Sequence, residues 1–241
     1  MNKQQRHINK LIKNLIKKGL KYNYKKNNFE KAIQMFDKAI ELNPNNANAY
    51  KHRGDVYLCT DLEKAIKDYT KAIELKPNYI GAYSARAAIY YSPLVDVPIA
   101  KAIEDYVTIL NYANNFCEAY ECLGEILSSY EDYEWADFMF TKAIELKPKR
   151  FNYYMQRGKI YLKLQKYENA IKDFNTVLEL LSDKAWYDVF IKCYKHRSEA
   201  YLQLGDKEKA DTDLKLMKEA EELMQKRKEW YLRIENATRN I

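Results

Sequence analysis

The sequence predicts an all-α fold built from stacked pairs of helices. A tyrosine is followed three residues later by Arg or Leu, and then at once by a small residue, in five separate segments. These segments begin at Tyr50, Tyr83, Tyr120, Tyr154 and Tyr194. A pattern that recurs at a nearly fixed spacing is typical of stacked supersecondary units. The 241 residues include only 6 Gly and 5 Pro, a composition that favours helices.

The second half of each unit shows the spacing of an amphipathic helix. The stretches 65–73 and 170–178 both carry apolar residues at positions i, i+1, i+4, i+7 and i+8. Pro44, Pro77 and Pro148 each follow such a stretch, as expected where a helix ends. The sequence therefore predicts two helices for each unit.

Three positions recur in every unit and carry a family resemblance. A small residue occupies the first of them, at Gly19, Gly54, Ala87, Gly124, Gly158 and Ser198. An alanine of the second helix occupies the next, at 32, 65, 102, 136, 170 and 210. A large residue lies four positions later, at Phe36, Tyr69, Tyr106, Phe140, Phe174 and Leu214. These units resemble tetratricopeptide repeats, which implies a right-handed superhelical solenoid of antiparallel helix pairs over about residues 12–224.

The spacing of the small residues predicts six repeats. Their expected bounds are about 12–45, 47–78, 80–114, 117–149, 151–184 and 191–224. Residues 1–11 are predicted to form a basic N-terminal helical extension, and residues 225–241 a C-terminal capping helix, either separate or continuous with the last repeat helix. Longer connections are expected at Ser92–Pro98 and at Leu181–Val189.

A pair of charged positions varies together from repeat to repeat. The pairs are Arg53 with Asp68, Arg86 with Asp105, Arg157 with Asp173, and Arg197 with Asp213. In the fourth repeat both positions are apolar, Leu123 and Met139. The simplest cause is direct contact between the two helices of one repeat, so we expect four Arg–carboxylate bridges.

The net charge of +7 comes from the N-terminal segment. Residues 1–29 hold nine Lys or Arg and no acid, and the remaining residues have a net charge of −2. The favoured interpretation is a first repeat helix with a solvated Lys face. The alternative is an anchor for nucleic acid or for an anionic membrane surface.

The sequence indicates a protein that is not an enzyme. The three histidines, at 7, 52 and 196, have no partner at metal-ligand spacing, and no phosphate-binding loop or nucleophile motif is present. We therefore expect no cofactor and no metal. Four cysteines, at 59, 117, 122 and 193, include no C-x-x-C pair and predict reduced thiols. No apolar signal core or stretch of ~20 apolar residues occurs, so a cytoplasmic protein is expected.

The resemblance also implies a concave groove lined by the first helices. The pattern of the known carboxylate clamp is missing from every set of consecutive repeats, so we do not expect that ligand mode. The predicted groove residues are Lys51, Asp55, Ser84, Ala88, Tyr91, Glu118, Glu121, Glu125, Lys159 and Lys163. The three glutamates fall on one helical face, and either Lys159 and Lys163 or a basic partner segment would compensate their charge.

The predicted function is a protein-interaction scaffold. The expected partner is a protein or peptide that carries Lys or Arg next to a large apolar residue, bound across repeats three to five. Two alternatives remain at this point: binding of nucleic acid or an anionic membrane through the basic N-terminal helix, and oligomerisation of a structural subunit through the C-terminal helix. The sequence identifies neither the partner nor the oligomeric state.

Overall fold

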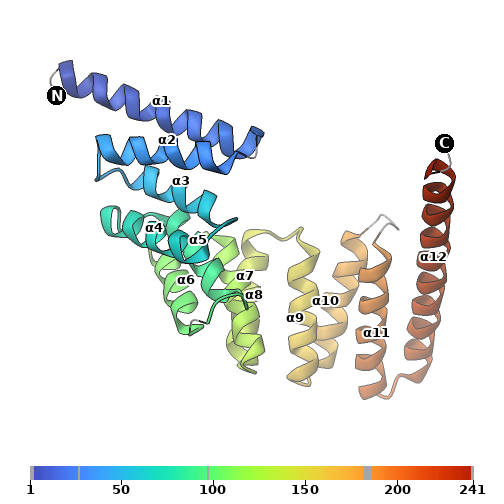
Figure 1. Ribbon diagram of the computed structural model, residues 1–241. Helices are drawn as coiled ribbons and strands as arrows, with labels where there is room; N and C mark the ends of the chain where they lie inside the picture. The colour runs from blue at the N-terminus through green and yellow to red at the C-terminus, as the bar shows by residue number, and fades with distance from the viewer. Residues whose placement is uncertain (1–2, 27, 97, 182–185, 240–241) are drawn as a thin grey trace. The chain divides into compact units, whose positions relative to one another are not determined.

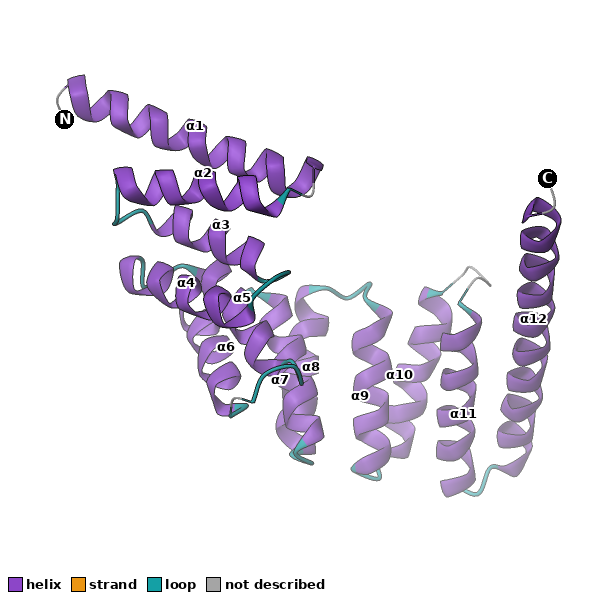
Figure 2. Ribbon diagram, viewed as in Figure 1, coloured by secondary structure: helices purple, strands orange, loops and turns teal. Residues whose placement is uncertain are grey.

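The computed structural model describes residues 3–26, 28–96, 98–181 and 186–239. Within these residues it contains twelve α-helices and no strand, so the predicted all-α class is confirmed (Figures 1 and 2). Consecutive helices form pairs, and twelve helices correspond to about six repeats. Residues 182–185 of the predicted long link, residue 97 of the predicted longer turn, and both chain ends (1–2 and 240–241) lie outside the described residues.

The chain divides into two compact units, residues 1–119 and 120–241. The first unit contains α1 (Lys3–Lys26), α2 (Phe29–Leu42), α3 (Ala47–Tyr57), α4 (Leu62–Leu75), α5 (Ile80–Tyr91) and α6 (Ala100–Tyr112). Each of these helices packs against the next one in the chain. The unit is therefore three stacked helix pairs.

The second unit begins inside the seventh helix. Its helices are α7 (Cys117–Ser129), α8 (Tyr133–Leu146), α9 (Phe151–Lys163), α10 (Tyr167–Leu180), α11 (Tyr187–Gln203) and α12 (Lys207–Arg239). From α8 onward each helix packs against its successor, and α9 also contacts α11. The first helices of the fifth and sixth repeats, α9 and α11, therefore lie side by side.

Local sequence signals explain where the helices begin and end. The side chains of Asn28, Asn46 and Asp61 accept hydrogen bonds from backbone N–H groups three residues later, at 3.0–3.1 Å, and so cap α2, α3 and α4. The helices α2, α4 and α8 all end two residues before a proline, because proline cannot continue the hydrogen-bond ladder.

The small residues mark the close approach of the two helices within a repeat. A Cβ atom added at Gly158 would lie 2.7 Å from the Phe174 ring, and one at Gly54 would lie 2.8 Å from the Tyr69 ring. Gly19 and Gly124 meet Phe36 and Phe140 in the same way. The small residue therefore lets the two helices of a repeat approach closely, and the second-helix aromatic fills the space above its own repeat's glycine.

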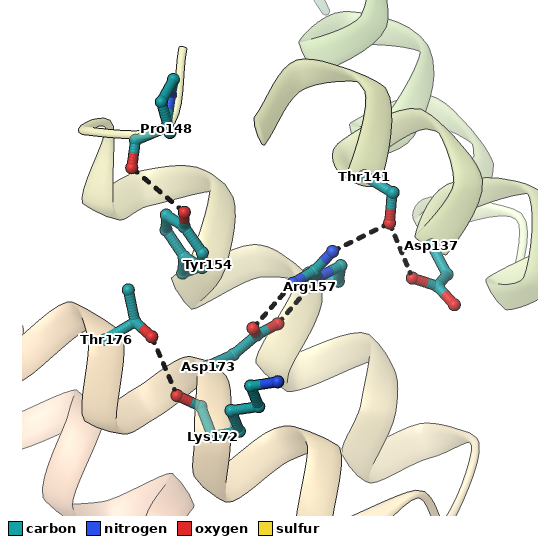
Figure 3. Close-up of polar contacts among 8 residues, drawn as sticks. All are labelled: Asp137, Thr141, Pro148, Tyr154, Arg157, Lys172, Asp173 and Thr176. Carbon is teal, nitrogen blue, oxygen red and sulfur yellow. Dashed lines mark hydrogen bonds and ion pairs between the residues drawn. The ribbon is translucent and has the colours of Figure 1, made fainter. Parts of the chain in front are cut away.

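All four predicted Arg–Asp bridges are present. In each one Nε and Nη2 of the arginine donate to the two oxygens of one aspartate, at 2.5–2.9 Å. The four aspartates are at most 5% exposed, so these are buried, bidentate, charge-assisted pairs. Figure 3 shows the forked contact between Arg157 and Asp173.

Each arginine also joins its repeat to the preceding one. The remaining nitrogen, Nη1, donates at 2.6–2.9 Å to the residue that follows the second-helix aromatic of the repeat before. These acceptors are Asp37, Thr70, Thr141 and Asn175. One guanidinium group therefore connects three helices.

Tyrosines flank every one of these guanidinium groups. The central carbon of each arginine lies 5.4–6.0 Å from the ring centroids of two tyrosines, three residues before it and four residues after it. This is cation–π distance. The arrangement explains the recurring Tyr-x-x-Arg pattern and gives a role to eight of the 22 tyrosines.

The last helix, α12, is a single element of 33 residues. Beyond its contact with α11 it carries a cluster of exposed large side chains, in which Trp230, Tyr231 and Leu232 are 52–58% exposed. Figure 1 shows that α12 extends past the end of α11. The described part of the predicted capping helix is therefore continuous with the last repeat helix.

Candidate peptide-binding face

Every predicted groove residue lies on the first helix of a repeat, and together these residues occupy α3, α5, α7 and α9. Six of them belong to the first unit, at 51, 55, 84, 88, 91 and 118, and four to the second, at 121, 125, 159 and 163.

In α3 the predicted charged residues bind each other. Lys51 Nζ lies 2.8 Å from Oδ2 of Asp55, and His52 Nδ1 lies 3.2 Å from the same oxygen. The hydroxyl of Tyr69 donates to the other oxygen at 3.0 Å. Burial raises the pKa of the Asp55 carboxyl, but the bonds from His52 and Lys51 outweigh it and the pKa is lowered. This carboxylate is held in its charged form by its own repeat.

The exposed face of α5 offers small side chains beside one aromatic ring. Ser84, Ala88 and Tyr91 are spaced at i, i+4 and i+7, so they share a helix face. Ala88 is exposed, whereas Ser84 and Tyr91 are half-buried. A Cβ added at the nearby Gly81 would meet no atom closer than 3.7 Å. A methyl group at Gly81 would therefore make ordinary van der Waals contacts without a clash.

The acidic face of α7 is partly engaged by α9. Glu118 is exposed, and Glu121 and Glu125 are half-buried. The hydroxyl of Tyr153 on α9 donates to Oε2 of Glu121 at 3.0 Å. Burial lowers the pKa of the Lys159 ammonium, as does Lys192, and the negative charge of Glu125 raises it. Lys159 is thus electrostatically linked to the acidic face of α7.

A surface cavity of about 370 Å³ lies where α9 meets α11. Its lining includes the predicted residues Lys159 and Lys163, together with Tyr167, His196 and Glu199. The prediction missed the contributions of α11, His196 and Glu199. The repetition of Lys-His-Arg at 51–53 and 195–197 was the signal in the sequence, but it did not reveal a cavity.

The two histidines of these tripeptides pack on aromatic rings. His52 stacks on Phe36 with ring centroids 6.0 Å apart, and His196 stacks on Phe174 at 5.9 Å. Each histidine therefore contacts the second-helix aromatic of the preceding repeat. Both have a structural role in the seam between repeats.

The described residues form neither a metal site nor a membrane span. No three His, Cys, Asp or Glu side chains in this part of the chain are grouped so that they could hold a metal ion. In the same residues, no helix combines the length and apolar character required to cross a membrane.

Segments of this chain that contain the repeat pattern match models of a known protein family. Residues 23–59 and 61–92 match a family model described as TPR repeat, and residues 151–184 match one described as tetratricopeptide repeat. This chain is a tetratricopeptide-repeat protein. The matched segments contain second-helix contacts of the kind described above, including the glycine–aromatic contact of Gly158 with Phe174.

Relatives and solved structures are similar over different lengths. Hsc70-interacting proteins 1 and 2 of Drosophila melanogaster are each 37% identical over 100 residues, which is 41% of this chain but only 25% of the length of those relatives. The structure of YrrB, a TPR protein, is 24% identical with a TM-score of 0.66 and covers 77% of this chain and 91% of its own. The structure of PilF of Pseudomonas aeruginosa is 16% identical with a TM-score of 0.66 and covers 91% of this chain and 99% of its own. The two structural likenesses show the fold.

Proposed function

We propose that this tetratricopeptide-repeat protein is a non-enzymatic scaffold that binds an extended segment of a partner protein along the exposed face of its first helices. Tetratricopeptide-repeat proteins mediate protein–protein interactions, and the Hsc70-interacting proteins that resemble this chain are named for one. The observation that carries the proposal is the acidic face of α7. Glu118 remains exposed, and Glu121 and Glu125 remain partly accessible beside the contacts from α9.

The chemistry of this face suggests the character of the partner segment. Three glutamates spaced at i, i+3 and i+7 share one face of α7, and their negative charge would attract a Lys or Arg of the partner. The small side chains beside Tyr91 on α5 suit a large apolar residue. We therefore expect the segment to carry a basic residue and a large apolar residue.

Affinity capture with the purified chain, followed by identification of the retained protein, provides the partner for a direct test. Changing Glu121 and Glu125 together to Lys should weaken binding by about 1–3 kcal/mol. Two control variants separate the effect of charge on binding from an effect on the stability of the chain. Tyr153→Phe removes the hydrogen bond to Glu121 without changing any charge. The double variant Glu179→Lys and Glu221→Lys makes the same change of charge at exposed positions of second helices. Unchanged affinity in the Glu121 and Glu125 variant would refute the proposed face.

A second candidate function concerns the first helix. A surface cavity of about 560 Å³ on α1 is lined by Leu11, Leu15 and Leu20 together with Lys17 and Lys18. Leu11 is 42% exposed. A cationic surface with exposed leucines suits an anionic membrane or nucleic acid. Binding to anionic vesicles or to RNA that falls steeply with salt and disappears when the exposed Lys17 and Lys18 are changed to Glu would favour this candidate.

A third candidate is self-association through α12. Self-association is favoured by three large side chains that lie exposed on this helix, those of Trp230, Tyr231 and Leu232. Sedimentation equilibrium of the parent chain and of a Trp230→Lys variant would measure whether the chain self-associates and whether Trp230 is required for it. A monomer at micromolar concentration would eliminate this candidate.

A further inference from the structure

The fourth repeat differs from the other five on the exposed side of its second helix, α8. Just before the second-helix alanine the other repeats have Lys or Asn, and two residues after that alanine they have Gln, Lys, Glu or Thr. The fourth repeat has Trp135 and Phe138 at these positions. Their side chains are 57% and 46% exposed, and their rings are in contact, with centroids 5.7 Å apart. Large aromatic side chains at positions that are polar in the other repeats indicate an interaction surface.

The charge around this aromatic pair is negative. Residues 124–141 contain five acids and no Lys or Arg. Three of these acids are exposed within four residues of Trp135, namely Glu131, Asp132 and Glu134. Lys166 lies 3.3 Å from Glu134, whose side chain is still 69% exposed. Lys142 is bound to Glu145 at 2.7 Å. The surface that fits this one is therefore an apolar recess with a positive rim.

The chain itself has such a recess on α1. The cavity of about 560 Å³ on this helix is lined by three leucines, Leu11, Leu15 and Leu20, and by three lysines, Lys17, Lys18 and Lys21. All three lysines are exposed. Residues 1–29 hold nine basic residues and no acid, so the charge of this helix is opposite to that around Trp135. A cavity of this volume can hold a large aromatic side chain.

Charge favours Trp135 over the other two tryptophans as the group that enters this cavity. Residues 226–233, around Trp230, contain four basic residues and one acid, and the lysines of α1 would repel them. Trp186 packs on Phe151 of the preceding repeat, with ring centroids 5.6 Å apart. Trp135 therefore combines exposure with the complementary charge.

We propose that this chain self-associates head to tail, with Trp135 and Phe138 of one copy inserted into the leucine-lined cavity on α1 of a second copy. The acids beside Trp135 then face the lysines at the rim of the cavity. Because the two surfaces differ, a pair of copies keeps one free surface of each kind and can add further copies. The contact is independent of the partner segment proposed above, and it uses other residues than self-association through α12.

Sedimentation equilibrium of the full chain at increasing concentration, up to about 100 μM, tests the proposal. The average mass should rise with concentration beyond that of a dimer, and added salt should reduce it. Trp135→Lys introduces the residue that four other repeats have at this position, so we expect the fold to be retained, as circular dichroism would verify. This variant should associate at least about tenfold more weakly than the parent chain. Trp230→Lys, the matched control, should associate as the parent chain does.

Mixing two variants tests the pairing of the two surfaces. Trp135→Lys keeps the cavity on α1, and the double variant Lys17→Glu and Lys18→Glu keeps the aromatic pair on α8. Each should be monomeric alone, whereas their mixture should form one-to-one dimers and nothing larger. A parent chain that stays monomeric at about 100 μM, or a Trp135→Lys variant that associates like the parent, would overturn the proposal. A mixture that stays monomeric would overturn it as well, and loss of association in Trp230→Lys alone would assign the contact to α12 instead.

Discussion

The buried arginine–aspartate bridge of the fifth repeat can be exchanged for the apolar pair that the fourth repeat already uses. Arg157→Leu and Asp173→Met reproduce Leu123 and Met139, singly and together. A double-mutant cycle then measures the coupling between the two positions. Because the fourth repeat is folded with Leu123 only 2% exposed, the apolar pair is compatible with this fold.

The structure sets the size of each effect. Asp173 is 3% exposed and receives two bonds of 2.8 Å from Arg157, so Arg157→Leu leaves a buried carboxylate without its cation. Breaking one partner of a buried pair destabilises by about 3–5 kcal/mol. Loss of the 2.9 Å bond from Nη1 to Thr141 adds about 1 kcal/mol. The double variant removes both charges, and we expect it to recover about 2–3 kcal/mol relative to the sum of the single variants.

The pH dependence of the single variant provides a second check. Burial raises the pKa of the Asp173 carboxyl and Arg157 opposes that rise, so removing the arginine raises the pKa further. A carboxyl whose pKa is higher in the folded state loses stability as pH rises from its unfolded value of about 3.9 toward the folded value. The free-energy difference between Arg157→Leu and the parent should therefore be smaller near about pH 4.5 than at about pH 7.

Urea denaturation followed by circular dichroism, at both pH values, measures the four free energies of unfolding. Additive single variants, with coupling below about 0.5 kcal/mol, would refute the claim that the bridge stabilises the repeat as a pair. A double variant that unfolds at the same urea concentration as Arg157→Leu would show instead that the inter-repeat bond to Thr141 dominates.

Two further predictions follow from the helix contacts. Gly158→Ala should destabilise the chain by about 1–3 kcal/mol, because the added Cβ would lie 2.7 Å from the Phe174 ring. Gly81→Ala, at an exposed helix position with no atom nearer than 3.7 Å, should instead stabilise the chain by about 0.5–1 kcal/mol. Equal melting temperatures for the two variants would contradict the assigned contact between Gly158 and Phe174. Burial raises the pKa of the Cys193 thiol to about 12, so this thiol should be unreactive in the folded chain. Iodoacetamide at about pH 8 should modify the exposed Cys59 and leave Cys193 unmodified until the chain unfolds. Mass spectrometry of the peptides measures both modifications.

Much of the fold follows from the sequence because the repeats act as internal copies of one another. Six occurrences of one helix pair show which positions must be small, which must be aromatic, and which charges vary together. The joint change from Arg and Asp to Leu123 and Met139 revealed a contact between two helices. The physical reason is that a buried charge is tolerated only with its partner, so both members of a pair change together.

Other contacts could not be predicted from the same comparison. The third bond of each arginine goes to Asp37, Thr70, Thr141 or Asn175, residues of different chemical types, because any oxygen acceptor satisfies Nη1. No regular residue type therefore marked that position. The partial engagement of Glu121 by Tyr153 was hidden for a similar reason, since it depends on how adjacent repeats stack.

The sequence alone thus determined the repeat register, the helix pairs and the intra-repeat bridges, all of which depend on residue types at fixed spacing. Only the tertiary structure decided which charged groups remain available for a ligand. His52 and His196 lie in the same tripeptide, yet one is paired with Asp55 and the other borders a cavity beside Glu199. The two acids differ by one methylene group, and their nearest oxygens lie 3.2 Å and 3.7 Å from the histidine Nδ1, a difference in distance that spacing along the chain does not specify.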